Sequence, residues 1–378
     1  MTRTIVIGGG IIGASIAYHL AGAGEQVHLL EREAFFGAES TAKCAGGIRA
    51  QFTTPVNIAL SLRSIACFSR FEAEVGYPAD FRQVGYLFMA RTADQESACH
   101  ERAAFQRERG VPVEWLDAKA IHALCPELDL TDIAGGNYCR LDGIGDPHGT
   151  LNGYIRAARD RGVVIETETP VLGFLLEEGQ VVGVRTSRGD RHAERIVIAA
   201  GAWSGRLAAT LGVEVPIEPV RRQIATTAPL PWISMDWPMM VDLDSGLYMH
   251  PESGGMLLGM ANWQEPPGFV TQVDDSFTTE IIMAGMTRMP RLDEASIASS
   301  WAGLYEVTPD HHPILDRLPG HPDVWIAAGF SGHGFMHAPA CGEVMAQLVR
   351  GETPAIDVSS LSLARFRSGA LPDEAMVI

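Results

Sequence analysis

The sequence predicts an α/β fold with two domains: one assembled from discontinuous segments around a parallel sheet, and an α+β domain with a large, mostly antiparallel sheet. Residues 4–31 give the first indication, because a short apolar strand ends at glycine, a helix follows, and a second strand ends in an acidic residue. Two further apolar strands, at 195–201 and 323–330, both contain Ala-Ala-Gly and favour one sheet built from separated segments. Residues 215–300 alternate short strands with Pro and Gly turns, which favours antiparallel pairing.

Composition limits the function classes. The chain has 378 residues, of which 46% are apolar, and a formal charge of -17. The size and apolar content are typical of two or three globular units, and the negative charge disfavours nucleic-acid binding. The six cysteines form no Cys-x-x-Cys pair, so we expect no metal site and a reduced, cytoplasmic location. No long apolar run predicts a membrane span.

The N-terminal unit carries a Gly-x-Gly-x-x-Gly motif, formed by Gly8, Gly10 and Gly13, between its first strand and its helix. Gly8 permits a tight turn, Gly10 lets the backbone approach a pyrophosphate, and Gly13 lets helix and strand pack closely. Glu31 ends the second strand, where a carboxylate accepts hydrogen bonds from a ribose. The unit therefore predicts a Rossmann-like dinucleotide site. A structural glycine turn and a solvated Glu31 remain the alternatives, and the motif alone does not separate FAD from NAD.

The remaining elements follow from the same periodicities. Residues 35–52 predict a loop that passes a ligand and leads into a helix through Ile65. The other expected elements are helical stretches in 90–125, a helix at 152–161, a strand at 163–166, a hairpin of strands 171–176 and 181–186, and a helix from about Pro339 to Val349.

Four segments together suggest a family: Glu31-Arg32, the loop 37–41, Ala199-Ala-Gly-Ala-Trp203, and Gly329-Phe-Ser-Gly-His-Gly-Phe335. In this order they resemble the FAD-dependent amino-acid oxidoreductases grouped around D-amino-acid oxidase, and most closely the sarcosine oxidase and proline dehydrogenase β-subunit branch. The similarity extends from Ile5 to about Phe366.

The resemblance implies bound FAD and a division of the chain into two domains. The FAD-binding domain would comprise residues 1–85, 146–218 and 305–378, and the substrate-binding domain 86–145 and 219–304. The residues expected to bind FAD are Gly8, Gly10, Ile11, Ile12, Gly13, Glu31, Arg32, Ser40, Thr41, Ala45, Gly46, Gly47, Val171, Ala200, Gly201, Trp203, Gly303, Gly329, Gly332, His333, Gly334, Phe335 and Met336.

The family pattern is also informative where it fails. Gly303 stands where monomeric sarcosine oxidases carry the cysteine that links the flavin, so we expect non-covalent FAD. Leu257 stands where the family pattern has a lysine associated with oxygen activation. Its absence weakens the argument that O2 is the natural electron acceptor. An active-site histidine of the same branch aligns near Ala261 of this sequence.

The resemblance also implies substrate-binding and catalytic residues. Arg49 matches the arginine that grips the substrate carboxylate, and a planar guanidinium suits bidentate capture. Tyr248 matches a pocket position, His250 is expected to shape the wall, and Met336 replaces a lysine that helps bind the carboxylate. With His333 of the glycine-rich segment, Arg49 and Tyr248 form the expected catalytic set. The alternatives are a loop salt bridge for Arg49 and an ordinary strand tyrosine for Tyr248.

The expected reaction is oxidation of the C–N bond of a small anionic amino acid by hydride transfer to flavin N5. The imine product then hydrolyses, and O2, giving H2O2, or another acceptor reoxidises the flavin. The amine must react neutral, so a dry pocket without a nearby carboxylate is expected. The glycine-rich segment Gly329–Phe335 and the helix after it are expected to supply positive potential to the reduced flavin.

Secondary or N-methyl amino acids of the sarcosine and L-proline type are the favoured substrates. The alternatives are a D-amino-acid dehydrogenase or oxidase acting on primary amines, a flavoprotein subunit that passes electrons to a partner chain, and a nicotinamide-dependent dehydrogenase. A homo-oligomer or an electron-accepting partner chain is compatible with these interpretations.

Overall fold

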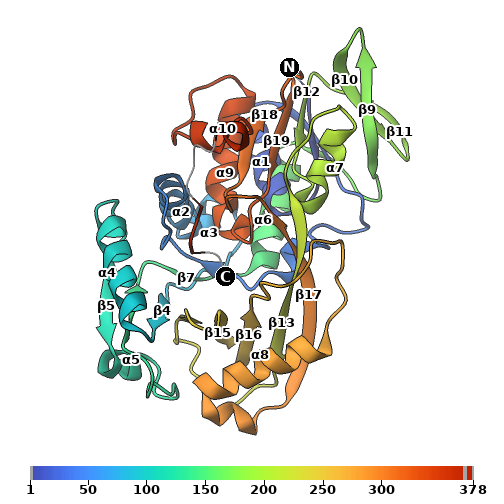
Figure 1. Ribbon diagram of the computed structural model, residues 1–378. Helices are drawn as coiled ribbons and strands as arrows, with labels where there is room; N and C mark the ends of the chain where they lie inside the picture. Colours follow the sequence, from blue (N-terminus) through green and yellow to red (C-terminus); the bar gives the residue numbers. More distant parts are fainter. Residues whose placement is uncertain (1–2, 369–372, 377–378) are drawn as a thin grey trace.

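The computed structural model describes residues 3–368 and 373–376, and the separated apolar strands join a six-stranded sheet of order β18-β19-β12-β1-β2-β8 (Figure 1). Strand β1 pairs in parallel with β2 and β12, β12 pairs in parallel with β19, and β18 closes the edge in the antiparallel direction. The expected sheet of discontinuous segments is confirmed. Its strands are β1 (Arg3–Ile7), β2 (Gln26–Leu30), β8 (Val164–Glu166), β12 (Arg195–Ile198), β18 (Ile314–Arg317) and β19 (Val324–Ala328).

Helices pack against this sheet and against one another. Helix α1 (Ile11–Gly22) contacts both α6 (Pro147–Asp160) and α9 (Gly334–Val349), and α9 also contacts α2 (Pro55–Phe68). Helix α1 is apolar on nearly all sides, as expected of a helix enclosed by other elements. Its start and the start of α9 therefore have fixed positions relative to the carboxyl ends of the strands.

The second sheet has eight strands in the order β17-β13-β16-β15-β14-β4-β6-β5 and lies below the first in Figure 1. Among its described strands β14 and β4 pair in parallel and the others pair antiparallel, so the mostly antiparallel sheet is confirmed. The strands are β4 (Tyr86–Ala90), β5 (Val113–Asp117), β6 (Gly135–Cys139), β13 (Glu218–Thr227), β14 (Met239–Asp242), β15 (Leu247–Glu252), β16 (Gly255–Met260) and β17 (Ile297–Val307).

Smaller elements complete the chain. The expected hairpin is confirmed as β9 and β10, which extend with β11 into a three-stranded sheet at the upper right of Figure 1. The bounds are β3 (Gly47–Ile48), β7 (Gly143–Ile144), β9 (Val171–Glu177), β10 (Gln180–Thr186), β11 (Gly189–His192), α3 (Phe71–Val75), α4 (Ala93–Arg107), α5 (Ala118–Leu124), α7 (Ser204–Ala209), α8 (Asp275–Arg288) and α10 (Arg365–Ser368).

Three element predictions were wrong in detail. Residues 215–300 contain helix α8, where only short strands and turns were expected. Residues 90–125 contain strand β5 between helices α4 and α5, because Val113–Asp117 pairs with β6 at the sheet edge. Helix α9 begins at Gly334 rather than near Pro339, so the proline lies inside the helix. A proline in the second turn removes one N–H but does not stop a helix that is buried against α1 and α2.

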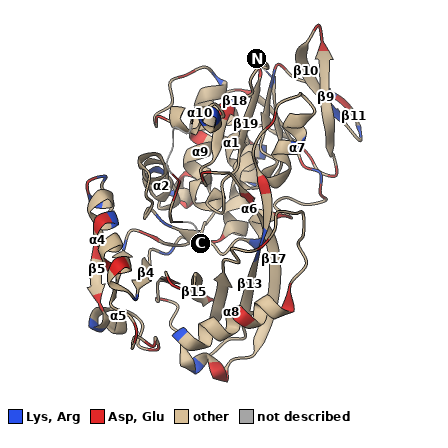
Figure 2. Ribbon diagram, in the orientation of Figure 1, with Lys and Arg blue, Asp and Glu red and all other residues tan. Residues whose placement is uncertain are grey.

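Acidic residues are spread over helices and strands in both the upper and the lower part of the molecule rather than gathered on one element (Figure 2). Within residues 3–368 and 373–376, none of the helices is long and apolar enough to cross a membrane. The strands of the eight-stranded sheet come from 86–139 and 218–307, whereas the domain boundaries given above remain a prediction.

Candidate functional site

A cavity of about 580 Å³ lies where the two sheets meet. The ends of β1, β2 and β19 reach it through Ile7, Leu30 and Ala327, and the eight-stranded sheet contributes Ile224 and Tyr248. In open α/β sheets, ligands bind at the carboxyl ends of parallel strands, and this cavity occupies that place.

One end of the cavity is formed by the N-terminal glycine turn. Gly8 has a φ of 110°, and a Cβ on Gly13 would lie 1.9 Å from the Gly8 carbonyl oxygen, so neither position accepts a side chain. The Ile11 N–H donates to Thr41 Oγ1 at 3.1 Å, which ties the start of α1 to the following loop. The first N–H groups of a helix have no partner inside it and attract anions. This end of the cavity fits a diphosphate.

Glu31 lies beside the same turn and is nearly buried, with 8% of its surface exposed. Its carboxylate accepts hydrogen bonds from the N–H groups of Gly9 at 2.7 Å and Glu33 at 2.8 Å. The side chain is therefore held at the end of β2 while it lines the cavity. This fixed orientation is compatible with the ribose contact expected from the sequence.

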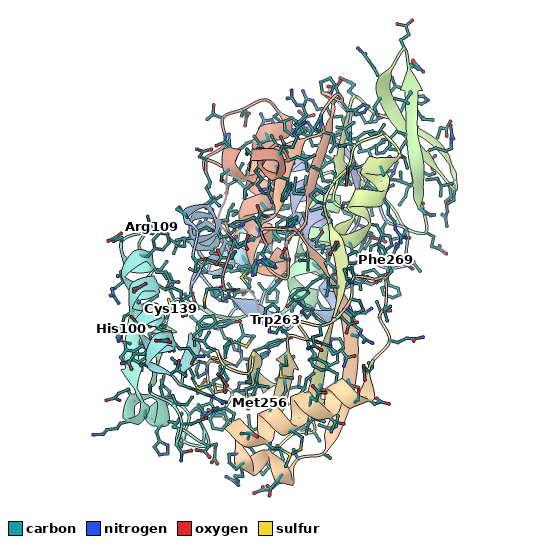
Figure 3. The ribbon with its side chains drawn as sticks, viewed as in Figure 1. His100, Arg109, Cys139, Met256, Trp263 and Phe269 are labelled. Carbon is teal, nitrogen blue, oxygen red and sulfur yellow. The ribbon has the colours of Figure 1, made fainter. Side chains whose placement is uncertain are left out.

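An aromatic and cationic stack closes the cavity beyond Glu31. The Arg32 guanidinium carbon lies 3.7 Å from the ring centre of Trp203. The ring of Phe269 lies 5.1 Å from the same indole, and it belongs to the loop between β16 and α8 (Figure 3). The Arg206 guanidinium packs on Phe269 at 3.7 Å. Segments that follow strands of both sheets thus contribute side chains to this stack.

A second glycine-rich turn forms the opposite end. Ser331 and Gly332 both have positive φ values, 49° and 96°, and a Cβ on Gly332 would lie 2.4 Å from the ring of Tyr305. The turn leads directly into α9, whose capping residue is His333. The cavity is thus lined by the starts of two helices, α1 and α9, and both can favour negative charge.

The residues of this cavity fit FAD. A Cβ on Gly303 would lie 2.9 Å from Lys43 Cβ, so this position, which the resemblance equates with a linking cysteine, has little room for a side chain here. Among the described cysteines, Cys44 lines the cavity, and burial raises the pKa of its thiol to about 11. A thiol with that pKa stays protonated at neutral pH, which disfavours it as a nucleophile.

Arg49 is the buried cation of the site, with 1% of its surface exposed. Its Nη1 donates to the Gln51 carbonyl and its Nη2 to the Met376 carbonyl, while Nη2 also lies 3.4 Å from His333 Nε2. In the described part of the chain its Nε has no hydrogen-bond partner and its guanidinium forms no ion pair with a carboxylate. Burial lowers the pKa of Arg49 from its ordinary value.

Tyr248, His333 and Met336 line the cavity as expected. Burial raises the pKa of the Tyr248 phenol well above its usual value. Burial, and then the charge of Arg49, hold the pKa of His333 well below its usual value. Both groups are therefore neutral at neutral pH. The positive charge that acts on His333 is Arg49, and the one that acts on Tyr248 is Arg222, which also lines the cavity.

His250 lies behind the wall and does not line the cavity. Its Nε2 is 2.9 Å from the Ala45 carbonyl oxygen and its Nδ1 is 2.9 Å from that of Pro251, so its ring holds the backbone of the wall. The ring thus shapes the wall through the Ala45 backbone, and the place of His250 among the substrate-binding residues remains a prediction. Gly13, Gly46 and Gly329 likewise shape the turns without lining the cavity.

The other expected residues all line the cavity. They are Gly8, Gly10, Ile11, Ile12, Glu31, Arg32, Ser40, Thr41, Ala45, Gly47, Arg49, Val171, Ala200, Gly201, Trp203, Tyr248, Gly303, Gly332, His333, Gly334, Phe335 and Met336. Sequence reasoning missed Lys43, Cys44, Tyr86, Arg222, Tyr305 and Glu306. Lys43 and Cys44 lie in the loop that was expected to pass a ligand, so the sequence could have indicated them. Tyr86 and Arg222 lie on strands that carry no motif, so no sequence signal indicated them.

Glu306 departs from the expectation of a pocket without a carboxylate. It lines the cavity, and its Oε2 accepts a hydrogen bond from the Gly329 N–H at 2.8 Å. Burial raises the pKa of this carboxyl to about 7. Near neutral pH the group is therefore partly protonated and presents less negative charge than an ordinary glutamate.

Comparisons with known proteins identify a family. The family model described as FAD dependent oxidoreductase matches residues 3–348. The chain is 31% identical over 360 residues to glycine oxidase of Bacillus licheniformis, covering 92% of this chain and 93% of that protein. It is 30% identical over 377 residues to 4-methylaminobutanoate oxidase (formaldehyde-forming) of Paenarthrobacter nicotinovorans, covering 96% of this chain but 45% of that protein. The chain thus spans about half the length of several of the curated relatives it matches.

Among solved structures, L-proline dehydrogenase from P. horikoshii superimposes with a TM-score of 0.92 at 32% identity, covering 98% of this chain and 99% of that one. The match therefore extends over nearly the whole chain. Since the family model also covers most of the chain, this protein belongs to the family of FAD-dependent oxidoreductases.

Proposed function

We propose that this protein oxidises the C–N bond of a secondary or N-methyl amino acid of the sarcosine or L-proline type. The observation that carries the proposal is Arg49, a buried guanidinium that lines the cavity without a carboxylate partner in the described chain. A buried charge is costly unless it is paired, so an anionic ligand is the natural partner of Arg49. A substrate carboxylate supplies that charge.

FAD would be held by the two glycine turns and by Glu31, and when bound it supplies the acceptor for a hydride equivalent taken from the carbon beside the substrate nitrogen. The chain's own residues have other tasks. Arg49 orients the carboxylate, and the neutral side chains of Tyr248 and His333 exclude water around the amine. A dry pocket lowers the pKa of an ammonium group, so the amine binds in the neutral form that can be oxidised.

The names of the relatives favour this substrate class. One is an oxidase of a methylamino acid, and one structural neighbour is a dehydrogenase of L-proline, whose amine is secondary. A glycine oxidase at comparable identity keeps a primary amine as the second candidate. We also propose that FAD is bound without a covalent link, since Gly303 has no side chain and the Cys44 thiol stays protonated.

Substrate-dependent reduction of the flavin tests the proposal. The yellow protein is mixed without oxygen with sarcosine, L-proline, glycine and D-amino acids, and flavin absorbance is recorded. Bleaching by sarcosine or L-proline supports the proposal, whereas bleaching by glycine or D-isomers alone favours the second candidate. Readmitting oxygen and measuring H2O2 then separates an oxidase from a dehydrogenase.

Arg49→Met should weaken substrate binding much more than FAD binding. Loss of charge-assisted hydrogen bonds worth about 1.5–3 kcal/mol corresponds to an apparent affinity that is about tenfold to a hundredfold lower. Arg49→Lys keeps the charge but not the planar guanidinium, so its apparent substrate affinity should lie between those of the wild type and Arg49→Met. The readouts are KM and the flavin content of purified protein. Unchanged KM in Arg49→Met would remove Arg49 from the substrate site.

A further inference from the structure

A short segment near the end of the chain, Glu374–Met376, lies between the two sheets and is called here the C-terminal strap (Figure 1). Glu374 is 1% exposed, although it is a carboxylate that belongs to no helix or strand. Its Oε1 accepts hydrogen bonds from Thr53 N at 2.8 Å and Thr53 Oγ1 at 2.6 Å. Its Oε2 accepts from Thr54 Oγ1 at 3.0 Å and Asn57 Nδ2 at 3.1 Å. This is a built receptor for one carboxylate.

The receptor lies at the start of α2, since Thr54 is the capping residue of that helix and its own side chain makes no capping bond. A carboxylate near a helix N-terminus is stabilised by the N–H groups and the helix dipole. Glu374 therefore anchors the strap at a fixed point. Two residues later, Met376 donates its N–H back to Glu374 Oε1 at 3.2 Å, so the anchor also orients Met376.

Met376 reaches the substrate side of the cavity. Its side chain is 6% exposed and packs in an apolar cluster with Tyr86, Phe88 and Tyr248, two of which line the cavity. Its carbonyl accepts a hydrogen bond from Arg49 Nη2. The strap thus contacts the guanidinium that, in the proposed function, holds the substrate carboxylate.

The geometry of the guanidinium makes this contact competitive. In arginine, Nε–H and one N–H of Nη2 point the same way along one edge, and a carboxylate binds such an edge with two parallel hydrogen bonds. At Arg49, Nε has no partner in the described chain, whereas Nη2 donates to the Met376 carbonyl and also lies 3.4 Å from His333 Nε2. The other nitrogen, Nη1, is occupied by the Gln51 carbonyl. When the Met376 carbonyl moves away, a substrate carboxylate can accept hydrogen bonds from both Nε and Nη2 along this edge of the guanidinium.

We propose that the C-terminal strap is a displaceable part of the substrate site, in which Met376 holds Arg49 until a carboxylate replaces it and Glu374 is the positioning residue that returns the strap. This inference rests on the proposed role of Arg49. A carboxylate forms stronger hydrogen bonds with a guanidinium than a neutral carbonyl does, so the exchange is favourable once the ligand enters. While Met376 is bonded to Arg49, the site cannot bind a carboxylate. The apparent affinity for the substrate is therefore reduced in proportion to the fraction of molecules in which Arg49 is free of Met376.

The test uses the flavin-loaded enzyme and acetate, a carboxylate without an amine, with binding measured by titration calorimetry. Glu374→Gln removes the charge of the anchor and places an amide donor against donors, so the strap should be released more often. We expect Glu374→Gln to bind acetate about tenfold more tightly than the wild type. Asp373→Asn makes the same charge change at the exposed neighbouring residue and should bind acetate as the wild type does.

Each outcome separates the two proposals. If Arg49→Met binds acetate as well as the wild type does, the anion site of the proposed function fails. If Arg49→Met binds weakly while Glu374→Gln and the wild type bind equally, or Glu374→Gln binds less tightly, the strap proposal is overturned and the role of Arg49 stands.

Hydrogen exchange on the unmutated enzyme gives a second measurement that does not depend on a variant folding. Saturating acetate should speed exchange at the amides of Thr53 and Met376, which Glu374 protects. Unchanged or slower exchange at both amides would mean that the strap stays in place, which contradicts the proposal.

Discussion

At the scale of single residues, Glu306 links the cavity to the pH dependence of stability. Burial raises the pKa of this carboxyl to about 7, above the ordinary value of 4.5. The folded protein therefore holds a proton that the unfolded chain has lost between these values. Its contribution to stability is fully present below about pH 4.5 and is lost as the pH rises to about 7.

Glu306→Gln should flatten this decline. A single such group changes the free energy of unfolding by at most about 1.4 kcal/mol per pH unit within its window. Asp142 keeps part of the slope in the variant, because burial raises its pKa to about 7 as well. Denaturant unfolding of flavin-free protein between pH 4.5 and 7 measures the effect, and Glu352→Gln at an exposed ion pair is the control. Equal slopes in wild type and Glu306→Gln would contradict the prediction.

The same scale shows what could not be predicted from sequence. Arg49 was found because its segment matches a family pattern, and the glycine turns because their backbone demands are local. The contact between Arg49 and Met376 joins residues 327 positions apart and follows from no periodicity or motif. The raised pKa of Glu306 depends on what covers it, and its neighbours in sequence do not encode that burial.

At the scale of elements, the crossing of α1 and α9 positions both helix starts at the cavity. The two helices lie close together at Gly342, where a Cβ would lie 2.1 Å from Ser15 Oγ and 2.9 Å from the Ser15 carbonyl carbon. Backbone and a buried Ser15 line this contact, so neither can move aside cheaply. A methyl group at 342 must therefore separate the helices.

Gly342→Ala should destabilise the protein by about 1–3 kcal/mol, as overpacking in a dense core does. The flavin content should fall as well, because the helix starts separate. Gly22→Ala in α1 is the matched control: its Cβ would meet the guanidinium end of Arg161, which can move aside at the cost of its hydrogen bonds to Tyr18, so a smaller loss of stability is expected there. Thermal unfolding and the ratio of flavin to protein measure both effects. If Gly342→Ala were as stable as Gly22→Ala, the contact between α1 and α9 would have room for a methyl group, which contradicts the prediction.

Helix boundaries illustrate where local rules stop. A start near Pro339 follows from the preference of proline for the first turn. The start at Gly334 is set instead by the left-handed backbone of Ser331 and Gly332, which reverses the chain immediately before the helix. Packing of the apolar face against α1 and α2 outweighs the hydrogen bond that Pro339 removes.

At the scale of the whole molecule, the sequence was sufficient to predict the two-sheet architecture but not the direction in which every pair of strands runs. Strands at 195–201 and 323–330 were expected to join the N-terminal unit, because a central parallel strand is apolar on both faces. The parallel pairing of β14 with β4 in the other sheet had no such signal, since a strand does not encode the direction of its neighbour. Long-range contacts decide that choice.

Removal of FAD should therefore act on two distant parts of the chain at once. The cavity is lined by the start of α1 and by the start of α9, so a ligand that spans it ties the first strands to the C-terminal helix. A bound ligand stabilises the folded state by about 4 kcal/mol when its concentration is about a thousand times its dissociation constant. Flavin-free protein, prepared by dialysis since no covalent link is expected, should unfold at a lower temperature. Hydrogen exchange should rise at Gly8–Gly13 and at Gly329–Gly334, while α8, which does not line the cavity, should exchange as before. A uniform rise that includes α8 would mean that FAD stabilises the molecule without bridging its two ends, and a rise at only one glycine turn would place the ligand at that end alone.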